Sequence, residues 1–438
     1  MQQRMRRKMW IPARLPMICL LLLLGTPHGA LGEEIEIPLS DGSDAFITLF
    51  PADGEQLFVW FPSEFGTSPR QPQVARALAS LGIEVWMPDL HATWFLPVGR
   101  YSLDDLDPVH LTEIMRAAHD RSGKRVYLMA PGRSAALGLE AIRHWQVAGM
   151  SQGDFGGAIL LHPKLFTRTP QGGEAAEFIP VAAATNVPLY LLQPEQSAYY
   201  WRSKQIRSKL EEGGAPVYLH ILKDVGDGFY ARPDYSREEE RMTRQLPQLL
   251  QRAIRLLAGT TGVPVTPAPL RTQEEHADRQ SEREPASAAL LKPYRGDRET
   301  PPLSLQTLDG ETIELANYSG KVVVLNFWTT WCPPCVEEIP SLERLRKLRT
   351  ARGLEVISVD VGEEPEKVRQ FLEDKPVGYP VALDPDAEAF VAWNTYAFPT
   401  TFILDRGHRI RYAVFGAFAW DSEEVLDAVD ALLEAEGN

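Results

Sequence analysis

The sequence predicts an α/β protein of two domains, because short apolar segments alternate with amphipathic segments on both sides of one polar stretch. The chain has 438 residues, more than one compact domain usually contains, and 44% of them are hydrophobic. Between residues 258 and 300 large apolar residues are few and no periodicity holds, which predicts a flexible linker. The predicted domains are therefore 33–257 and 301–438.

The first predicted domain is built on a mostly parallel sheet. Several of its apolar runs are nearly continuous, as expected for strands that helices cover on both faces. The predicted strands are 45–50, 57–61, 83–87, 125–130, 157–161, 188–192 and 217–222, and the predicted helices are 73–80, 108–121, 135–147, 199–212 and 237–257.

The second predicted domain has the same alternation in a shorter chain, so we expect a smaller α/β sheet there. Its predicted strands are 322–329, 354–361, 381–383, 400–404 and 410–414, and its predicted helices are 332–352, 365–373, 387–395 and 422–436.

The first 32 residues have the pattern of a secretory signal peptide. A basic start precedes the short apolar run 17–24, and Ala30-Leu31-Gly32 offers small residues at the spacing of a cleavage site. The run is shorter than the roughly 20 residues of a spanning helix. We therefore expect a periplasmic or otherwise extracytoplasmic protein that is soluble after cleavage. The alternative is a protein anchored by an uncleaved N-terminal segment.

The acidic balance of the chain argues against two kinds of partner. There are 45 Lys and Arg residues against 59 Asp and Glu residues, for a net charge of −14. The first 32 residues hold five of the basic residues and no acidic ones, so the remainder carries −19. Such a surface repels phosphate groups, and we expect neither nucleic acid nor an anionic membrane as a partner.

Cysteine usage concentrates thiol chemistry at one place. Of three cysteines, Cys19 lies in the predicted signal peptide, and the others are Cys332 and Cys335. Structural disulfides of an exported protein are usually spread along the chain. A pair this close restrains the unfolded chain little, so it predicts a redox-active disulfide. His408 is the sole histidine of the second domain, and zinc needs about four ligands, so we expect no metal and no further cofactor.

The two cysteines open a predicted helix, in the motif Trp331-Cys332-Pro333-Pro334-Cys335. Unpaired backbone N–H groups and the helix dipole lower the pKa of a thiol at this position. Proline is tolerated there because its missing N–H would have had no partner. Cys332 is then the exposed nucleophile that attacks a substrate disulfide, and Cys335 resolves the mixed disulfide.

The segment 321–340, with its strand, its Trp-Cys-Pro-Pro-Cys motif and the following Val-Glu-Glu-Ile-Pro, resembles the TlpA/ResA-type branch of the thioredoxin superfamily. The similarity covers about 301–438, and the run 302–320 resembles that branch's opening hairpin. The resemblance implies a thioredoxin-like fold and an exported, usually reducing thiol–disulfide oxidoreductase. Its partners would be protein thiol or disulfide clients, as in cytochrome c maturation, and a membrane electron donor of the DsbD/CcdA kind.

Two further residues match this branch. Pro399, in Phe398-Pro399-Thr400, matches the cis-proline loop, which would lie against the dithiol and offer backbone groups to a substrate. Glu338, on the helix face of Cys335, matches an acidic residue that would move a proton to or from the resolving thiol. Asn326 stands where thioredoxin has a buried acid, which favours Glu338 as the proton-handling group.

The first domain resembles the α/β-hydrolase fold. Gly132-Arg133-Ser134-Ala135-Ala136 follows a predicted strand and opens a helix, the context of a nucleophile elbow, with Ser134 as the candidate nucleophile. Glu195 is the candidate acid, and Asp227 occupies the place where this family has its histidine. Without an imidazole base, ordinary acyl transfer is not expected. A binding module that docks or presents a client is the preferred interpretation, since His91, His162 and His220 fit core or surface positions.

Three functions stay open at this point. The first is a dithiol reductase of extracytoplasmic cysteines. The second is a disulfide-forming oxidant, which Pro334 disfavours because such proteins often place histidine before the second cysteine. The third is a hydrolase or ligand-binding protein with an accessory thioredoxin-like domain.

Overall fold

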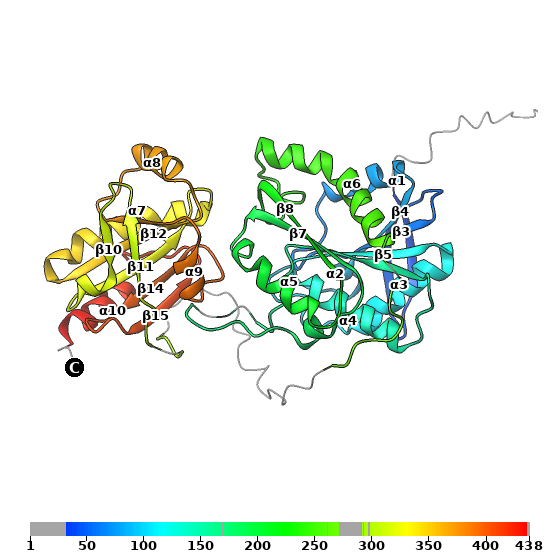
Figure 1. The fold of residues 1–438 in the computed structure, drawn as a ribbon, viewed down its shortest axis with the longest axis horizontal. Coiled ribbons are helices and arrows are strands. Elements are labelled where there is room, and N and C mark those ends of the chain that lie inside the picture. The colour runs from blue at the N-terminus through cyan, green and yellow to red at the C-terminus, as the bar shows by residue number, and fades with distance from the viewer. Residues whose placement is uncertain are drawn as a thin grey trace, which may run out of the picture.

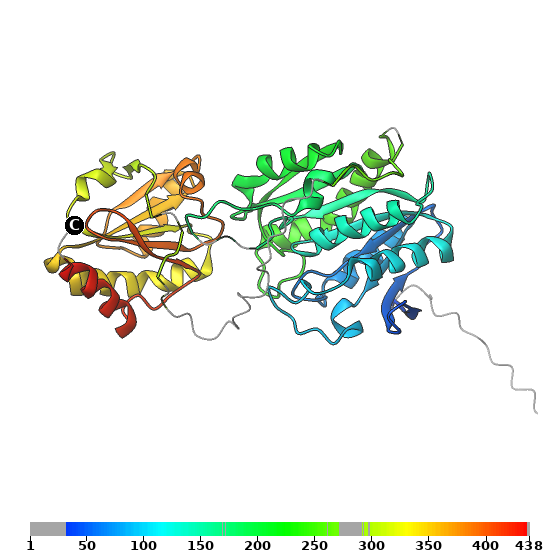
Figure 2. The same cartoon turned by 90° about the horizontal axis from the view of Figure 1, so that it is seen from below.

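The computed structural model describes residues 32–168, 170, 172–260, 262–270, 291, 293–296 and 298–435. The predicted signal peptide lies outside these residues, apart from Gly32. Two α/β units stand side by side in both views, one coloured blue to green and the other yellow to red (Figures 1 and 2). Among the described residues, no helix is long and apolar enough to cross a membrane.

The N-terminal unit is built on an eight-stranded sheet in the order β1-β2-β4-β3-β5-β6-β7-β8. Strands β3 to β8 are mutually parallel, whereas β2 runs antiparallel to both β1 and β4. The bounds are β1 Glu33–Pro38, β2 Asp44–Phe50, β3 Gln56–Trp60, β4 Ile83–Pro88, β5 Arg125–Pro131, β6 Phe155–Leu161, β7 Leu189–Gln196 and β8 Val217–Gly226.

Helices cover both faces of this sheet, which explains the continuous burial of its central strands. Helices α3, α4 and α5 pack on one face, and α1 and α6 pack on the other. The bounds are α1 Gln71–Ser80, α2 Leu90–Thr93, α3 Pro108–Ser122, α4 Ser134–Val147, α5 Ser203–Glu211 and α6 Arg237–Ala258, with 3-10 turns at Pro180–Ala184 and Tyr200–Arg202. All residues of β4 and β6 are buried, as their apolar runs predicted.

The C-terminal unit is a seven-stranded sheet in the order β10-β9-β13-β12-β11-β14-β15. The central strand β11 pairs in parallel with β12 and antiparallel with β14. The strands are β9 Ser304–Thr307, β10 Thr312–Glu314, β11 Val322–Trp328, β12 Leu354–Val361, β13 Val381–Asp384, β14 Thr400–Leu404 and β15 Ile410–Phe415. The helices are α7 Pro333–Arg349, α8 Pro365–Asp374, α9 Glu388–Ala392 and α10 Glu423–Glu434, with α7 and α10 packed against one face.

The structure differs from the sequence prediction at strand β1 and at the start of two helices, and it has the short helix α2, which was not predicted. Strand β1 was not predicted, because three glutamates interrupt its apolar residues and leave it mostly exposed at the sheet edge. The predicted helix 199–212 begins instead as a 3-10 turn, and α5 starts at Ser203. The helix predicted from residue 332 begins at Pro333, with Cys332 as its N-cap.

The predicted linker 258–300 is held at both ends. On its N-terminal side, Nε2 of Gln146 donates to the carbonyl of Pro264 at 2.6 Å, and Nδ2 of Asn186 donates to that of Thr266 at 2.9 Å. On its C-terminal side, the backbone N–H of Tyr294 donates to the carbonyl of Arg411 at 2.7 Å. Residues 271–290 lie outside the described part of the chain.

The two units also contact each other directly. The guanidinium of Arg202 donates to the carbonyl of Val391 at 3.1 Å and lies 4.5 Å from the ring centroid of Tyr396. The hydroxyl of Tyr396 accepts from the N–H of Ala176 at 3.0 Å, and its ring packs into the hydrophobic core of the N-terminal unit. These contacts fix the end of α9 and the segment after it against the N-terminal unit.

Candidate functional site

The cysteine pair lies where a buried strand ends and a helix begins. Every residue of β11 is buried, and the chain then turns through 329–331 into α7. Cys332 and Cys335 form a disulfide with their Cα atoms 5.3 Å apart. The N–H of Cys335 donates to Sγ of Cys332 at 3.3 Å, and Pro333 occupies the first helical position. A thiolate formed at Cys332 on reduction therefore faces the positive end of α7, which favours its negative charge.

The segment that ends in Pro399 lies beside this disulfide. The peptide bond between Phe398 and Pro399 is cis. The ring of Phe398 meets that of Trp331 edge-on, with centroids 5.7 Å apart, and Phe398 packs against the cluster that contains both cysteines. Strand β14 follows at once and holds this segment next to β11. Trp331, Pro333 and Phe398, the residue before Pro399, thus lie around Cys332.

Glu338 is buried one turn into α7 and fully hydrogen bonded. Its Oε1 accepts from Nδ2 of Asn326 at 2.8 Å, and its Oε2 accepts from Nε1 of Trp420 at 2.8 Å and from the N–H of Phe418 at 3.3 Å. Burial raises the pKa of Glu338 to about 7, although these hydrogen bonds pull it down. The carboxyl therefore changes charge in the neutral pH range, where a proton carrier is useful.

Two further buried carboxylates near the cysteine loop, Glu363 and Asp360, were not predicted. Glu363 is buried and accepts from Oγ1 of Thr330 at 2.7 Å, which anchors the turn that leads into Cys332. Asp360 at the end of β12 is also buried, and both its burial and the nearby Glu363 raise its pKa. The position of Asp360 in the sequence could have indicated it, because Asp360 lies at the carboxyl end of a strand next to β11, where sites of α/β proteins form.

The N-terminal unit does not assemble the triad that its motifs suggested. Ser134 begins α4, is fully buried, and donates its Oγ hydrogen bond to the carbonyl of Pro131 at 2.7 Å. The left-handed residue at the tip of the turn is Gly132, with φ of 57°. Ser134 is therefore not the exposed nucleophile expected at the elbow, because the residue at the tip carries no side chain.

A buried carboxylate fills the space above this turn. Oε2 of Glu64 accepts from the N–H of Arg133 at 3.2 Å, and Oε1 pairs with Nζ of Lys164 at 2.7 Å. A Cβ atom built on Gly132 would lie 2.5 Å from Oε2 of Glu64. Although burial alone would raise it, the pKa of Glu64 is held below its ordinary value by Lys164 and the backbone donors. This ion pair could not be predicted from the sequence, since its partners belong to separate loops.

The other two members of the expected triad lie apart. Oε2 of Glu195 accepts from the N–H of Asp224 at 3.2 Å. Oδ2 of Asp227 accepts from Oγ of Ser197 at 3.1 Å, and its Oδ1 is buried without a partner in the described part of the chain. Burial lowers the pKa of His162, whose ring nitrogens make no hydrogen bond to any described residue. No hydrogen bond among the described side chains joins Ser134, Glu195 and Asp227.

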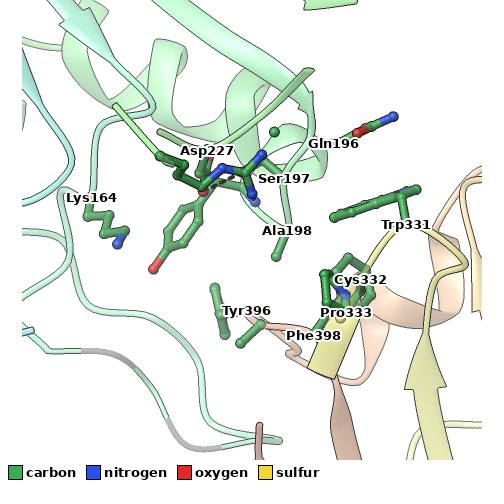
Figure 3. Close-up of a pocket in the computed structure, with 14 residues that line it drawn as sticks. Lys164, Gln196, Ser197, Ala198, Asp227, Trp331, Cys332, Pro333, Tyr396 and Phe398 are labelled. Carbon is green, nitrogen blue, oxygen red and sulfur yellow. Dashed lines mark hydrogen bonds between the residues drawn. The ribbon is translucent and has the colours of Figure 1, made fainter. Parts of the chain in front are cut away.

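A cavity of ≈ 290 Å³ connects the two units. Figure 3 shows Lys164, Ser197, Ala198 and Asp227 on the side of the N-terminal unit, facing Trp331, Cys332 and Phe398. The lining residues are Lys164, Gln196, Ser197, Ala198, Tyr199, Gly226, Asp227, Arg232, Trp331, Cys332, Pro333, Tyr396, Ala397 and Phe398. Within the described residues, no cluster of His, Cys, Asp and Glu side chains is arranged to hold a metal ion.

These features define the class of the C-terminal unit. A disulfide at the N-terminus of the helix that follows the central strand, with a cis-proline segment beside it, is the arrangement of a thioredoxin-like thiol–disulfide oxidoreductase. Residues 297–413 match the AhpC/TSA family.

Curated relatives give the family more narrowly. The thiol-disulfide oxidoreductase ResA of Bacillus subtilis is 36% identical over 118 residues, which is 27% of this chain and 66% of that protein. The ResA of Geobacillus kaustophilus is 33% identical over 124 residues, which is 28% of this chain and 71% of that protein. The chain belongs to the ResA-type thiol–disulfide oxidoreductases through its C-terminal unit, and it spans about two thirds of the length of these relatives.

Solved structures are similar to part of this chain. A thiol:disulfide interchange protein of the thioredoxin family from Chlorobium tepidum is 26% identical and covers 32% of this chain and 99% of its own, with a TM-score of 0.29. StoA from Bacillus subtilis is 22% identical and covers 30% of this chain and 98% of its own, with a TM-score of 0.27.

Proposed function

We propose that this protein is exported and reduces disulfides of protein clients through the Cys332–Cys335 pair. The observation that carries the proposal is the position of Cys332, the N-cap of α7 at the edge of a cavity. The basic and apolar pattern of residues 1–32 supports export. N-terminal sequencing of the mature protein tests this part: a start near residue 33 supports cleavage, and an intact N-terminus supports the anchored alternative.

The proposed reaction is two consecutive thiol–disulfide exchanges. The Cys332 thiolate attacks one sulfur of the client disulfide, a mixed disulfide forms, and the other client sulfur leaves as a thiolate. Cys335 then loses its proton and attacks Sγ of Cys332, which releases the second client thiol and leaves the protein oxidised. Two electrons pass from the protein to the client.

Glu338 is proposed to take the proton of Cys335 in the second exchange. It lies one helical turn beyond that cysteine, and its raised pKa of about 7 lets it accept and return a proton near neutral pH. Pro399 is proposed to offer its neighbouring backbone groups to the client strand. Restoring the dithiol requires a reductant, for which a membrane thiol carrier of the DsbD/CcdA kind is proposed.

The reduction potential of the Cys332–Cys335 pair tests the direction of electron flow. Equilibration with dithiothreitol or glutathione buffers, followed by thiol alkylation, measures it. A value near that of thioredoxin, about −270 mV, supports the reductase. A value near about −120 mV contradicts it and makes the protein a disulfide donor.

The N-terminal unit is proposed to be an α/β-hydrolase-like module that binds but does not hydrolyse. The strand order with antiparallel β2 supports the fold, as does the turn between β5 and α4. Gly132 at the tip of that turn and the Glu64 carboxylate on the N–H of Arg133 argue against acyl transfer, because the tip carries no nucleophilic side chain and the oxyanion donor is already occupied. Turnover of p-nitrophenyl acetate that Ser134→Ala abolishes would contradict this proposal.

A further inference from the structure

Both units contribute residues to the cavity beside Cys332, and contacts within the protein hold these residues in place. Cys332 is only 4% exposed, so a client sulfur has to approach it through a confined space. The segment Tyr396–Phe398 that forms part of the C-terminal wall is fixed by contacts of Tyr396 with Arg202 and Ala176. On the N-terminal wall, Ser197 and Asp227 bond to each other at 3.1 Å.

The two cations of the lining already have partners. Lys164 pairs with Glu64 at 2.7 Å, and Arg232 pairs with Glu239. Asp227 has no cationic partner among the described residues, and its Oδ1 is buried without a hydrogen bond. A buried carboxylate oxygen without a donor is costly, so a ligand that donates a hydrogen bond to Oδ1 is favoured at this wall. Nε of Arg232 is a buried donor that has no acceptor among the described residues.

The charges of this end of the cavity select the donor. Lys164 and Arg232 are each paired with a carboxylate outside the lining, Glu64 and Glu239, so Asp227 is the charged lining residue left without an ion pair among the described residues. An ammonium group neutralises the charge of Asp227, whereas an amide N–H only satisfies the hydrogen bond. The volume of ≈ 290 Å³ is at the lower end for ligand sites, which fits a small or narrow ligand better than a folded protein surface.

We propose that this composite cavity binds a disulfide of the cystine type, with a free amine next to its sulfur, and that Asp227 binds the amine while Cys332 attacks the sulfur. A backbone oxygen of the same ligand would take the Nε–H of Arg232. The source of the group is free cystine or a cysteine at the start of a chain. This inference rests on the proposed thiol–disulfide exchange and adds the substrate class to it.

The test uses three disulfides with one skeleton: L-cystine, N,N′-diacetyl-L-cystine with blocked amines, and L-cystine dimethyl ester with blocked carboxylates. The reduced full-length protein is mixed with each, oxidation is followed by tryptophan fluorescence, and rates are divided by those of free dithiothreitol to remove intrinsic reactivity. We expect cystine and its dimethyl ester to react at least about tenfold faster than diacetylcystine on this scale. In Asp227→Asn, the normalised rates of the three disulfides should lie within about twofold of one another.

The matched control is Asp234→Asn, which removes the same charge from an exposed position of the loop after β8 and should leave the preference intact. Equal normalised rates for cystine and diacetylcystine in the unmodified protein would overturn the inference, because an internal cysteine would then serve as well. If both aspartate variants lose the preference equally, general electrostatics explains it and the inference falls. If no disulfide oxidises the protein, the proposed function itself fails.

A second variant tests whether clients use the cavity, separately from the charge of Asp227. Ala198 lines the cavity from the N-terminal unit, and Ala198→Trp would fill part of it. We expect all three disulfides to react at least about fivefold more slowly, with the reduction potential of the cysteine pair unchanged. Unchanged rates in a folded Ala198→Trp protein would mean that clients reach Cys332 from another side, and the composite cavity would not be the substrate site.

Discussion

The side-chain amide of Asn326 donates a 2.8 Å hydrogen bond to the buried carboxylate of Glu338. Asn326 is itself buried in the central strand, where it also donates to Oγ1 of Thr401 at 2.9 Å. A neutral donor on strand β11 therefore holds the carboxylate of Glu338, which helix α7 places one turn beyond Cys335. A neutral donor leaves the pKa of Glu338 raised by burial, whereas a cation in its place would have lowered it.

The first prediction concerns the pH profile of the resolving step. If Glu338 takes the proton of Cys335, release of the mixed disulfide should accelerate as pH rises through about 7, because the carboxylate form is the acceptor. Glu338→Gln should remove this step and slow release at pH 8 by about a hundredfold. The measurement is release of a fluorescent thiol from Cys332. The exposed neighbour offers the control, Glu337→Gln, whose profile should match that of the unmodified protein.

The same carboxyl should make stability depend on pH. In the unfolded chain Glu338 titrates near 4.5, and in the folded protein near 7, so the folded state binds the extra proton between these values. The free energy of unfolding should therefore fall as pH rises from about 4.5 to about 7, by about 3 kcal/mol, and then level. Urea titrations of Glu338→Gln should lack this slope, while those of Glu337→Gln retain it. A slope shared by all three proteins would contradict the assignment.

The third prediction separates the two cysteines. Cys335→Ser should accumulate a stable mixed disulfide between Cys332 and its client, because the motif has lost the thiol that resolves it. Cys332→Ser should accumulate none, since Cys335 is 1% exposed and a client disulfide does not reach it. Non-reducing electrophoresis and mass spectrometry of the trapped species decide between them. Trapping on Cys335 instead would reverse the proposed roles.

The C-terminal unit could be predicted closely from the sequence because its signals are local. Strand β11 is an unbroken apolar run, and the motif 331–335 stands at its end, so the position of the cysteine pair followed from neighbouring residues. Glu338 was predicted from its helical spacing to Cys335 and from the resemblance to the TlpA/ResA-type branch. Its hydrogen bonds to Phe418 and Trp420 were out of reach, since they depend on how the last strand and helix return to α7.

In the N-terminal unit, the spacing of the motif did not reveal the conformation of the turn. The pattern Gly-x-Ser at 132–134 fits an elbow, but which residue occupies its tip depends on backbone angles, and the left-handed one is Gly132. The contacts between the two units could not be predicted from the sequence either. Arg202 reads as one charged residue of an amphipathic helix, yet it is 6% exposed and packs on Tyr396 of the other unit.

Arg202 should therefore couple the two units, which is the fourth prediction. Arg202→Ala removes the hydrogen bond to Val391 and the contact with the Tyr396 ring, and we expect a loss of about 2–3 kcal/mol from the unfolding free energy. Two thermal transitions in place of one would accompany it. Arg207→Ala in the adjacent helix α5 breaks an exposed pair with Glu211 and should change stability by less than about 0.5 kcal/mol. Equal effects of both variants would contradict the coupling.

The last prediction tests the elbow itself. Gly132→Ser would place a hydroxyl side chain where an acting hydrolase has its nucleophile, but its Cβ would lie 2.5 Å from Oε2 of Glu64 at a left-handed backbone position. We expect a loss of about 2–4 kcal/mol in urea unfolding, from backbone strain and from displacement of a buried, paired carboxylate. Gly42→Ser measures the backbone strain alone, because Gly42 has φ of 86° and no described atom lies within 4 Å of its Cβ position. This variant should lose about 1–2 kcal/mol of unfolding free energy.

Neither variant should hydrolyse p-nitrophenyl acetate, since Glu64 occupies the N–H of Arg133 that would otherwise bind the oxyanion. Ester turnover that appears with Gly132→Ser and not with Gly42→Ser would show that the N-terminal unit keeps a working acyl-transfer site.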